Sequence, residues 1–256
     1  MRRSAAAPVA RGGLHRRMSG TVTWLRLDRP AAGNRITLEL AQALCEAAAE
    51  IELDDRIAVV VLEAAGASFC LGVEERGEWE HRVDWVAAIG RLTRPVIAAV
   101  HGDAIAEGLE LALACDLRLV SAGAHVAMPQ LTLGRLPAHG GTQRLPRIVG
   151  RMRALDLLLT GRSVDAYEAE AIGLASRVAA PENFAAALDA LIVTLQSKGP
   201  IALRYAKEAV LAGSDLMLDQ GVRLEQDLYV LLQTTQDRRE GIDAFLKKRT
   251  PVFTGK

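Results

Sequence analysis

Two glutamates, Glu107 and Glu110, lie three residues apart in the otherwise small and apolar stretch "HGDAIAEGLELALACDL", residues 101–117. A helix over this stretch places both carboxylates on one face, one turn apart. Paired carboxylates suit general acid and base catalysis, because one group takes a proton while the other gives one. The stretch therefore predicts a helix with two acids on one face, and either of them is a candidate for such chemistry.

The composition bounds the class of protein. The chain has 256 residues, half of them hydrophobic, with 31 basic and 31 acidic residues, which indicates a single globular domain or one with a small appendage. With a net charge of zero, the chain has no excess of positive charge to attract nucleic acid, so nucleic acid is not an expected partner. The three cysteines lie far apart with no CxxC pair, which favours a reducing compartment and predicts no bound metal.

The first residues, "MRRSAAAPVARGGLHRRMSG", are basic and contain no apolar run long enough for a secretory signal. Two interpretations stay open: an over-extended start, with Met18 as the true first residue, or a weak organelle-transit sequence. We expect a cytoplasmic protein, with mitochondrial import only if the leader is genuine. Because no apolar run reaches the roughly 18 residues of a membrane span, no membrane partner is expected.

Strands and helices alternate through the first half of the chain. Alternating or β-branched segments predict the strands, and apolar residues at helical spacing predict the helices. Strands are expected at 21–28, 57–64, 67–72, 95–102, 117–122 and 125–129, and helices at 36–54, within 73–92 and at the opening stretch.

The last third reads as one amphipathic helix after another. These helices are expected at 151–161, 165–173, 183–199, 200–213, 215–236 and 239–249. Their apolar faces need a partner surface, so this part is expected to serve assembly.

Three segments carry a family resemblance: "RPVIAAVHGDAIAEGLELALACDLRL", "MPQLTLGRLPAHGGTQRLPRIVG" and "LTGRSVDAYEAEAIGLASRV". Together they resemble the enoyl-CoA hydratase, or crotonase, superfamily, over essentially everything after residue 20. The resemblance implies an α/β fold with a crotonase-type, Clp-like core of repeated ββα units. It divides the chain into a flexible basic leader (1–18), the core (19–195) and a helical C-terminal region (196–256) that builds homotrimers or hexamers and completes the coenzyme A site.

The resemblance also implies acyl-CoA thioesters as substrates and an enolate held by two backbone N–H groups, here those of Val73 and Glu107. Preorganised donors stabilise such a charge strongly in a dry site. No cofactor is expected, since coenzyme A is part of the substrate.

The family's first catalytic glutamate corresponds to Glu110, and the second corresponds to Gln130, an amide that exchanges no proton near neutral pH. His139 lies in the loop that faces the pocket in relatives, either as a replacement acid–base group or as a loop histidine bonded to a carbonyl. We expect the side chain of Glu107 to be solvated or capping, with only its backbone N–H contributing.

Further substrate-binding candidates follow from family position. Glu74, in the charged run 74–81, is either part of the acyl pocket and a secondary acid–base group or the solvated start of a helix. Arg29 is a candidate for the coenzyme A phosphates and adenine, as are Phe245 and Lys248 from a neighbouring chain.

The leading hypothesis is an enoyl-CoA hydratase-type lyase with one retained glutamate, Glu110. The same fold also accommodates a CoA-ester isomerase, a decarboxylase or a thioester hydrolase. A hypothesis of another class is a catalytically degenerate acyl-CoA binding or scaffold protein, motivated by Gln130 and Glu107.

Overall fold

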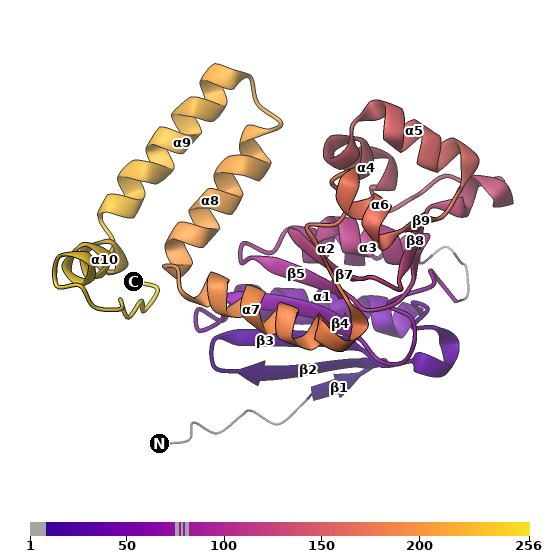
Figure 1. Cartoon of the computed structure of the whole chain (residues 1–256), viewed down its shortest axis with the longest axis horizontal. Helices are drawn as coiled ribbons and strands as arrows, with labels where there is room; N and C mark the ends of the chain where they lie inside the picture. Colours follow the sequence, from indigo (N-terminus) through magenta and orange to yellow (C-terminus); the bar gives the residue numbers. More distant parts are fainter. Residues whose placement is uncertain (1–8, 75–76, 78, 80–81) are drawn as a thin grey trace.

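The structure is a computed structural model that describes residues 9–74, 77, 79 and 82–256. Within these residues a seven-stranded sheet has the order β1-β2-β3-β4-β5-β7-β10 (Figure 1). The first three strands run antiparallel, and every pair from β3 onward is parallel. The strands are β1 (Val9–Arg11), β2 (Leu14–Ser19), β3 (Val22–Leu27), β4 (Val59–Ala64), β5 (Val96–Val100), β7 (Leu117–Ser121) and β10 (Arg177–Ala179).

A smaller sheet of the described residues consists of β6 (Ala104–Ile105), β8 (His125–Ala127) and β9 (Val164–Asp165). The helices of the first half are α1 (Leu38–Glu52), α2 (Trp85–Gly90) and α3 (Glu107–Ala114). The remaining helices are α4 (Gly141–Val149), α5 (Arg151–Thr160), α6 (Ala166–Ala171), α7 (Phe184–Gln196), α8 (Pro200–Gly213), α9 (Leu218–Gln233) and α10 (Gln236–Leu246). Short 3-10 turns lie at Pro30–Ala32, Pro129–Leu133 and Pro181–Asn183.

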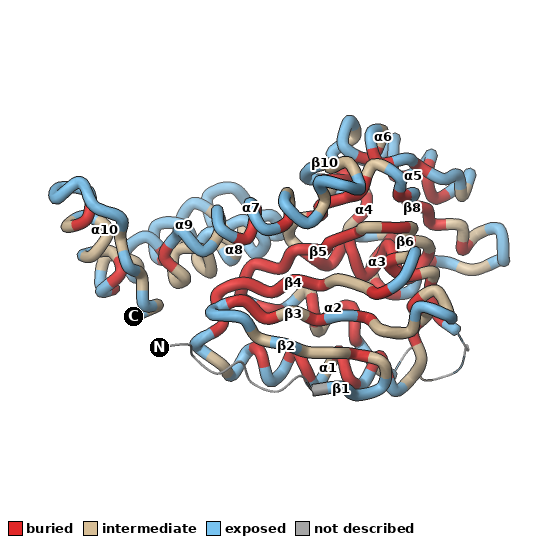
Figure 2. The backbone as a smooth tube through the Cα atoms, turned by 60° about the horizontal axis from the view of Figure 1, so that its bottom comes forward, coloured by how far each residue is buried: buried red, intermediate tan, exposed pale blue. Residues whose placement is uncertain are grey.

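The main sheet is covered on both faces. On β4, Val60 and Leu62 join the core cluster that contains residues of α1, α2 and α3, while Val59 and Val61 join the cluster that contains residues of α7. Successive side chains of a strand point to opposite faces, so a strand covered on both sides must be apolar throughout. Figure 2 shows the buried central strands between these layers.

The loops that follow β4 and β5 lie against each other. The Cys70 N–H donates to the carbonyl of Asp103 (3.1 Å), and the Ile105 N–H donates to the carbonyl of Cys70 (2.9 Å). Ligand sites of open parallel sheets form outside the carboxyl ends of the strands, where such loops meet. The helix α3 begins at this junction.

The expectation of a flexible leader is wrong for residues 9–18, which contain β1 and most of β2; residues 1–8 lie outside the described residues. The strand β2 pairs with β3 from Leu14↔Leu27 to Ser19↔Val22, and Leu14 is buried in the core. The arginines of β2 made this segment resemble a basic leader in the sequence. In the structure one of them, Arg16, forms an ion pair with Glu50 of α1.

Two further expectations need correction. The strand expected at 67–72 is only an isolated bridge between Cys70 and Ala104, because this segment crosses from the sheet to the site rather than extending it. The largely helical last third also contains the short strand β10, which adds to the parallel sheet beside β7. With three residues, β10 is too short to give a periodic signal.

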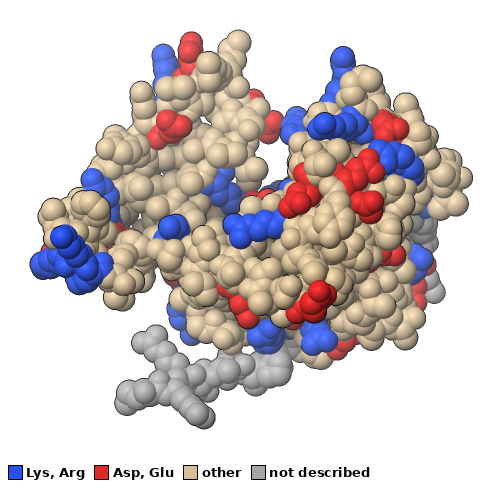
Figure 3. Space-filling view, in the orientation of Figure 1, with Lys and Arg blue, Asp and Glu red and all other residues tan. Residues whose placement is uncertain are grey.

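The helices α8, α9 and α10 form an arm that extends from the body (Figures 1 and 2). Figure 3 shows a hollow between this arm and the lobe of α4 and α5, with basic and acidic side chains interspersed over the face. Large apolar side chains of the arm are exposed in the single chain, among them Val210, Met217, Val230, Phe245 and Leu246.

Candidate active site

The helix α3 brings two acids into the interior. It begins after Ala106, which has a positive φ of 54°, and all eight of its residues, Glu107 to Ala114, are buried. Glu107 is 3% exposed and Glu110 is 0% exposed. Acidic side chains are almost never buried this deeply unless other groups of the protein bind them.

The carboxylate of Glu110 is bound by the N-terminus of α4. Its Oε1 accepts hydrogen bonds from the backbone N–H groups of His139 and Gly141, both at 2.8 Å. A Cβ atom added to Gly141 would lie 3.0 Å from this oxygen, so the close approach depends on glycine. These two donors fix the carboxylate in one orientation.

Gln130 lies on the other side of the same carboxylate. Its Nε2 donates to Oε2 of Glu110 at 3.3 Å, and the side chain is 1% exposed. Within the described part of the chain, the buried Oε1 of Gln130 has no hydrogen-bond partner. Such an orphaned acceptor beside a carboxylate is a position where a water molecule or a substrate group gains a hydrogen bond.

His139 binds Glu110 through its backbone N–H, which donates to Oε1 of the carboxylate. Its ring packs against Trp85 of α2 at a centroid distance of 5.0 Å, and its carbonyl accepts a hydrogen bond from Arg144 at 2.7 Å. His139 is 8% exposed, so the histidine is part of the wall around Glu110. The choice between an acid–base group and a loop histidine stays a prediction.

Burial raises the pKa of Glu110 to about 7, against an ordinary value of 4.5. The N–H groups of Gly141 and His139 and the guanidinium of Arg144 oppose this shift by stabilising the charged form, while the nearby Glu107 adds to it. A carboxyl group with a pKa near neutral pH can both take up and release a proton at that pH.

The two expected oxyanion donors belong to segments that touch. On either side of Val73 the backbone bonds to Ile36: the Gly72 carbonyl accepts from the Ile36 N–H, and the Glu74 N–H donates to the Ile36 carbonyl, both at 2.9 Å. Within the described residues, the N–H of Val73 itself donates no hydrogen bond. The N–H of Glu107 belongs to the first turn of α3, where N–H groups have no partner within the helix. A Cβ on Gly108 would lie 2.1 Å from the Cys70 carbonyl oxygen, so α3 packs directly against the segment that contains Val73.

The expectation of a solvated side chain at Glu107 is wrong, and the alternative of a capping side chain stays a prediction. Only 3% of the residue is exposed. Its Oε2 lies 2.8 Å from the position that a Cβ on Gly72 would occupy. The segment 70–73 covers the first turn of α3, so a side chain at position 107 is enclosed next to the expected oxyanion site.

Arg29 and Glu74 form an ion pair with each other, and Arg29 also donates to the carbonyl of Arg35 at 2.6 Å. Glu74 directly follows Val73, so the pair lies beside the expected oxyanion segment. Of the run 74–81, only Glu74, Gly77 and Trp79 are among the described residues.

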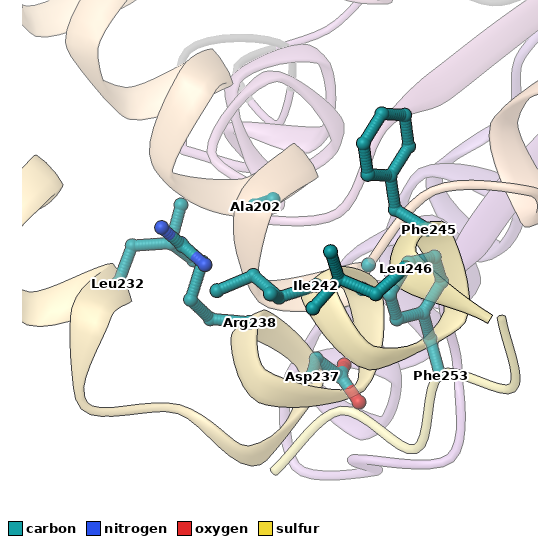
Figure 4. Close-up of a pocket in the computed structure, with 10 residues that line it drawn as sticks. Ala202, Leu232, Asp237, Arg238, Ile242, Phe245, Leu246 and Phe253 are labelled. Atoms are coloured by element: carbon teal, nitrogen blue, oxygen red, sulfur yellow. The ribbon is translucent and has the colours of Figure 1, made fainter.

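Phe245 belongs to α10, and Lys248 follows this helix by two residues. The helix α10 lies at the end of the arm, away from α3 of the same chain (Figure 1). Phe245 is 83% exposed and lines an apolar cavity of about 430 Å³ formed by α8, α9, α10 and the C-terminal segment (Figure 4). The single chain therefore does not bring these two residues to Glu110.

Three residues that touch or influence the site were not predicted from the sequence. Trp85 packs on His139, Arg144 acts on Glu110 electrostatically, and Arg35 donates to the Leu71 carbonyl at 2.6 Å beside the oxyanion segment. Arg144 is one turn after Gly140 and Gly141, and this spacing from the glycine pair was the available signal.

Among the described residues, no cluster of three or more His, Cys, Asp or Glu side chains is placed to hold a metal ion. In the same part of the chain, no helix has the length and apolar character needed to cross a membrane.

Comparison with known proteins identifies the family. The enoyl-CoA hydratase/isomerase family matches residues 17–256. A Bacillus subtilis protein named as an enoyl-CoA hydratase/isomerase, YngF, is 39% identical over 90% of this chain and 94% of its own, and a Rhizobium meliloti protein named as an enoyl-CoA hydratase is 36% identical over 91% and 95%. The crystal structure of an enoyl-CoA hydratase from Bacillus anthracis superposes with a TM-score of 0.91 at 33% identity, over 95% of this chain and all of that one.

The chain therefore belongs to the enoyl-CoA hydratase/isomerase family and has the crotonase fold. It is an enzyme of this family.

Proposed function

We propose that this enzyme adds water to a 2-enoyl-CoA thioester, with Glu110 as the group that carries the proton. The observation that supports this most is the pairing of Glu110 with Gln130, whose buried Oε1 lacks a partner in the described residues. A water molecule between this oxygen and the Glu110 carboxylate would donate to both. Such a water molecule would be held in position to attack C3 of the substrate, and it would already be in contact with Glu110, the base that takes its proton.

In this proposal the thioester oxygen lies between the N–H groups of Val73 and Glu107. Both are backbone donors on packed segments, and the N-terminus of α3 adds a favourable partial positive charge. These groups stabilise the negative charge that develops on the thioester oxygen as C3 is attacked. Removing one donor of a comparable oxyanion hole costs about 100- to 1,000-fold in turnover.

The proton balance of the reaction needs only one carboxylate. Ionised Glu110 takes a proton from the bound water as the oxygen forms a bond to C3, and the π electrons pass to the thioester enolate. The enolate then collapses, and C2 takes the proton back from Glu110. The hydroxyl and the hydrogen of one water molecule have been added, and Glu110 is ionised again.

Coenzyme A enters as part of the substrate, so the proposal includes no further cofactor. Arg29, with Glu74 bound to it, and Phe245 and Lys248 from a neighbouring chain are the proposed contacts for the CoA portion. The exposure of Phe245 at the end of the arm is consistent with a role across a subunit interface in a homotrimer or hexamer.

A second candidate is migration of the double bond between the 3-enoyl and 2-enoyl positions. Gln130 in place of an acid favours it, because an isomerase can use a single base that removes a proton from C2 and returns it to C4. The pKa of Glu110, raised to about 7 by burial, suits such a shuttle as well.

Two assays separate these reactions. Loss of conjugated thioester absorbance on incubation with crotonyl-CoA reports hydration, and gain of the same absorbance from a 3-enoyl-CoA reports isomerisation. Hydration is the expected result. No absorbance change with either ester over a range of chain lengths would overturn the proposal. Stabilisation of the protein by CoA esters without any product would instead favour the binding or scaffold hypothesis.

A further inference from the structure

The segment after α10 turns back along that helix and is held there by two acids. Asp237, at the start of α10 and 5% exposed, accepts hydrogen bonds from the N–H groups of Thr254 at 2.7 Å and Gly255 at 2.8 Å. One turn later on the same face, Glu240 accepts a hydrogen bond from the Val252 N–H at 2.8 Å. These bonds fix the path of the returning segment along α10.

Two side chains of the returning segment add to these backbone contacts. The guanidinium of Arg249 pairs with Glu240 at 2.6 and 2.8 Å and with Asp243 at 2.6 Å. The ring of Phe253 lines the apolar cavity between α8 and α10, and a Cβ on Gly241 of α10 would lie 3.6 Å from it (Figure 4). The segment is therefore bound to α10 by backbone, charged and aromatic groups.

The chain reverses its direction at Lys248, in a conformation that a lysine disfavours. The φ of Lys248 is 51°. Its N–H donates to the Phe245 carbonyl at 3.2 Å, and the Arg249 N–H donates to the Ala244 carbonyl at 3.0 Å. This is the Schellman motif, in which the residue with positive φ is usually glycine. A lysine at this position is strained, and the contacts of the returning segment hold it there.

The side chain of this strained residue is left without a charged partner. Lys248 is exposed and forms no ion pair among the described residues, whereas its neighbour Lys247 pairs with Asp243 at 2.8 Å. Phe245, three residues before Lys248, is 83% exposed. A free ammonium beside an exposed aromatic ring suits a ligand that has a phosphate and a flat base, as the nucleotide end of coenzyme A has.

We propose that the returning segment is a clamp: it holds Lys248 in its left-handed conformation so that the ammonium binds a phosphate of coenzyme A, and Asp237 and Glu240 are the positioning residues of this contact. The inference rests on the proposed function, because it takes Phe245 and Lys248 as contacts for the CoA portion in a neighbouring chain's site. Without the clamp, the turn is free to relax to a right-handed conformation, which moves the ammonium away.

The first test compares stability with affinity in Lys248→Gly, a variant that suits the turn but lacks the ammonium. It should melt at a higher temperature than the wild type, because glycine adopts a positive φ without strain. Its affinity for coenzyme A, measured by calorimetry, should fall about tenfold or more. If the turn served the fold alone, this more stable variant would bind coenzyme A at least as well as the wild type.

The second test addresses the clamp itself through Asp237→Asn. This change weakens the bonds to the returning segment and should lower the affinity for coenzyme A by about threefold to tenfold. The KM for crotonyl-CoA should rise with little change in kcat, while the KM for crotonyl-pantetheine, which lacks the nucleotide, should stay the same. In Asp237→Asn/Lys248→Gly the Asp237 change should have no further effect on affinity, because the ammonium that it positions is gone.

Asp227→Asn provides the matched control, since Asp227 is an exposed acid of α9 in the same arm. It should alter neither the melting temperature nor the affinity for coenzyme A. If Asp237→Asn fails to fold, Glu240→Gln takes its place with the same expected result, because it weakens the bonds to the Val252 N–H and to Arg249.

Wild-type affinity for coenzyme A in a folded Asp237→Asn of unchanged assembly mass would overturn the inference. An equal effect of the Asp237 change with lysine and with glycine at position 248 would also overturn it. Calorimetry needs no turnover, so the two proposals can fail separately. A wild type that binds coenzyme A but hydrates no enoyl-CoA ester would overturn only the proposed function, and one that binds no coenzyme A would overturn the inference.

Discussion

At the scale of single residues, Glu110 is the centre of the site because the fold gives it opposing influences. Burial favours its neutral form, and the two N–H donors at the start of α4 favour its charged form. A solvent-exposed glutamate has neither the burial nor the two N–H donors. The balance leaves a carboxyl group that changes its charge near neutral pH, and both activity and stability should report this.

Protein stability should fall with rising pH because of Glu110. Its folded-state pKa of about 7 lies above the unfolded value of 4.5, so the folded protein holds the extra proton between these two values. Stability is therefore highest below pH 4.5 for this group and is lost as pH rises through 7, by about 3 kcal/mol in all. Urea unfolding of the wild type and of Glu110→Gln at pH 5 and pH 8 measures the difference. An equal gap between the two proteins at both pH values would contradict the shift.

The backbone N–H of His139 donates to Glu110 and its ring packs on Trp85, so we expect the ring to contribute little to proton transfer. His139→Phe preserves the N–H and an aromatic surface for Trp85. We expect turnover within about tenfold of the wild type, whereas loss of a true acid–base group costs about 100-fold or more. Steady-state kinetics of the variant test this prediction. A 100-fold loss of turnover in a folded variant would contradict it and would indicate that the ring is an acid–base group.

At the scale of elements, the site depends on how closely α3 packs against the segment 70–73. A Cβ on Gly108 would meet the backbone oxygen of Cys70 at 2.1 Å, and backbone cannot move aside as a side chain can. Gly108→Ala should cost about 1–3 kcal/mol of stability. Gly123→Ala, at a glycine with open space around its Cβ position, is the matched control and should change little. Thermal unfolding of both variants tests this, and equal melting temperatures would refute the close packing.

Much of this arrangement is predictable from the sequence, because the periodic segments are long. The strands β3, β4 and β5 and the helices α1 and α3 appear where the alternation of apolar residues indicates. The gathering of Glu110, Gln130 and His139 follows from the family resemblance. The burial of the Glu107 side chain does not follow, since it depends on a neighbouring loop that periodicity cannot place.

The N-terminal strands are a second feature that the sequence did not predict. The basic residues of β2 suggest a leader, yet they lie on a strand whose partner is β3 and whose Leu14 enters the core. A chain that begins at Met18 would lack β1 and most of β2. We expect it to melt several degrees lower than the full chain, since deletion exposes core that β2 covers. Calorimetry of the two proteins checks this, and equal melting temperatures would show that β2 contributes nothing.

At the scale of the whole molecule, the arm of α8, α9 and α10 exposes apolar side chains that a neighbouring copy would cover. We expect trimers or hexamers, with Phe245 and Lys248 reaching the site of another chain. Light scattering gives the mass of the assembly. Mixing the inactive variants Glu110→Gln and Phe245→Asp/Lys248→Glu should restore part of the activity, because some sites then receive one intact residue set from each parent. Monomers in solution, or no recovery from mixing, would contradict the shared site.

The central claim is that Glu110 carries the proton in the addition of water to an enoyl-CoA thioester. The most direct measurement is mass spectrometry of the product from crotonyl-CoA in oxygen-18 water, with the wild type and Glu110→Gln compared at neutral pH. The account predicts labelled 3-hydroxyacyl-CoA from the wild type and a rate lower by about 100-fold or more from the variant. Labelled product at the wild-type rate from Glu110→Gln would contradict it.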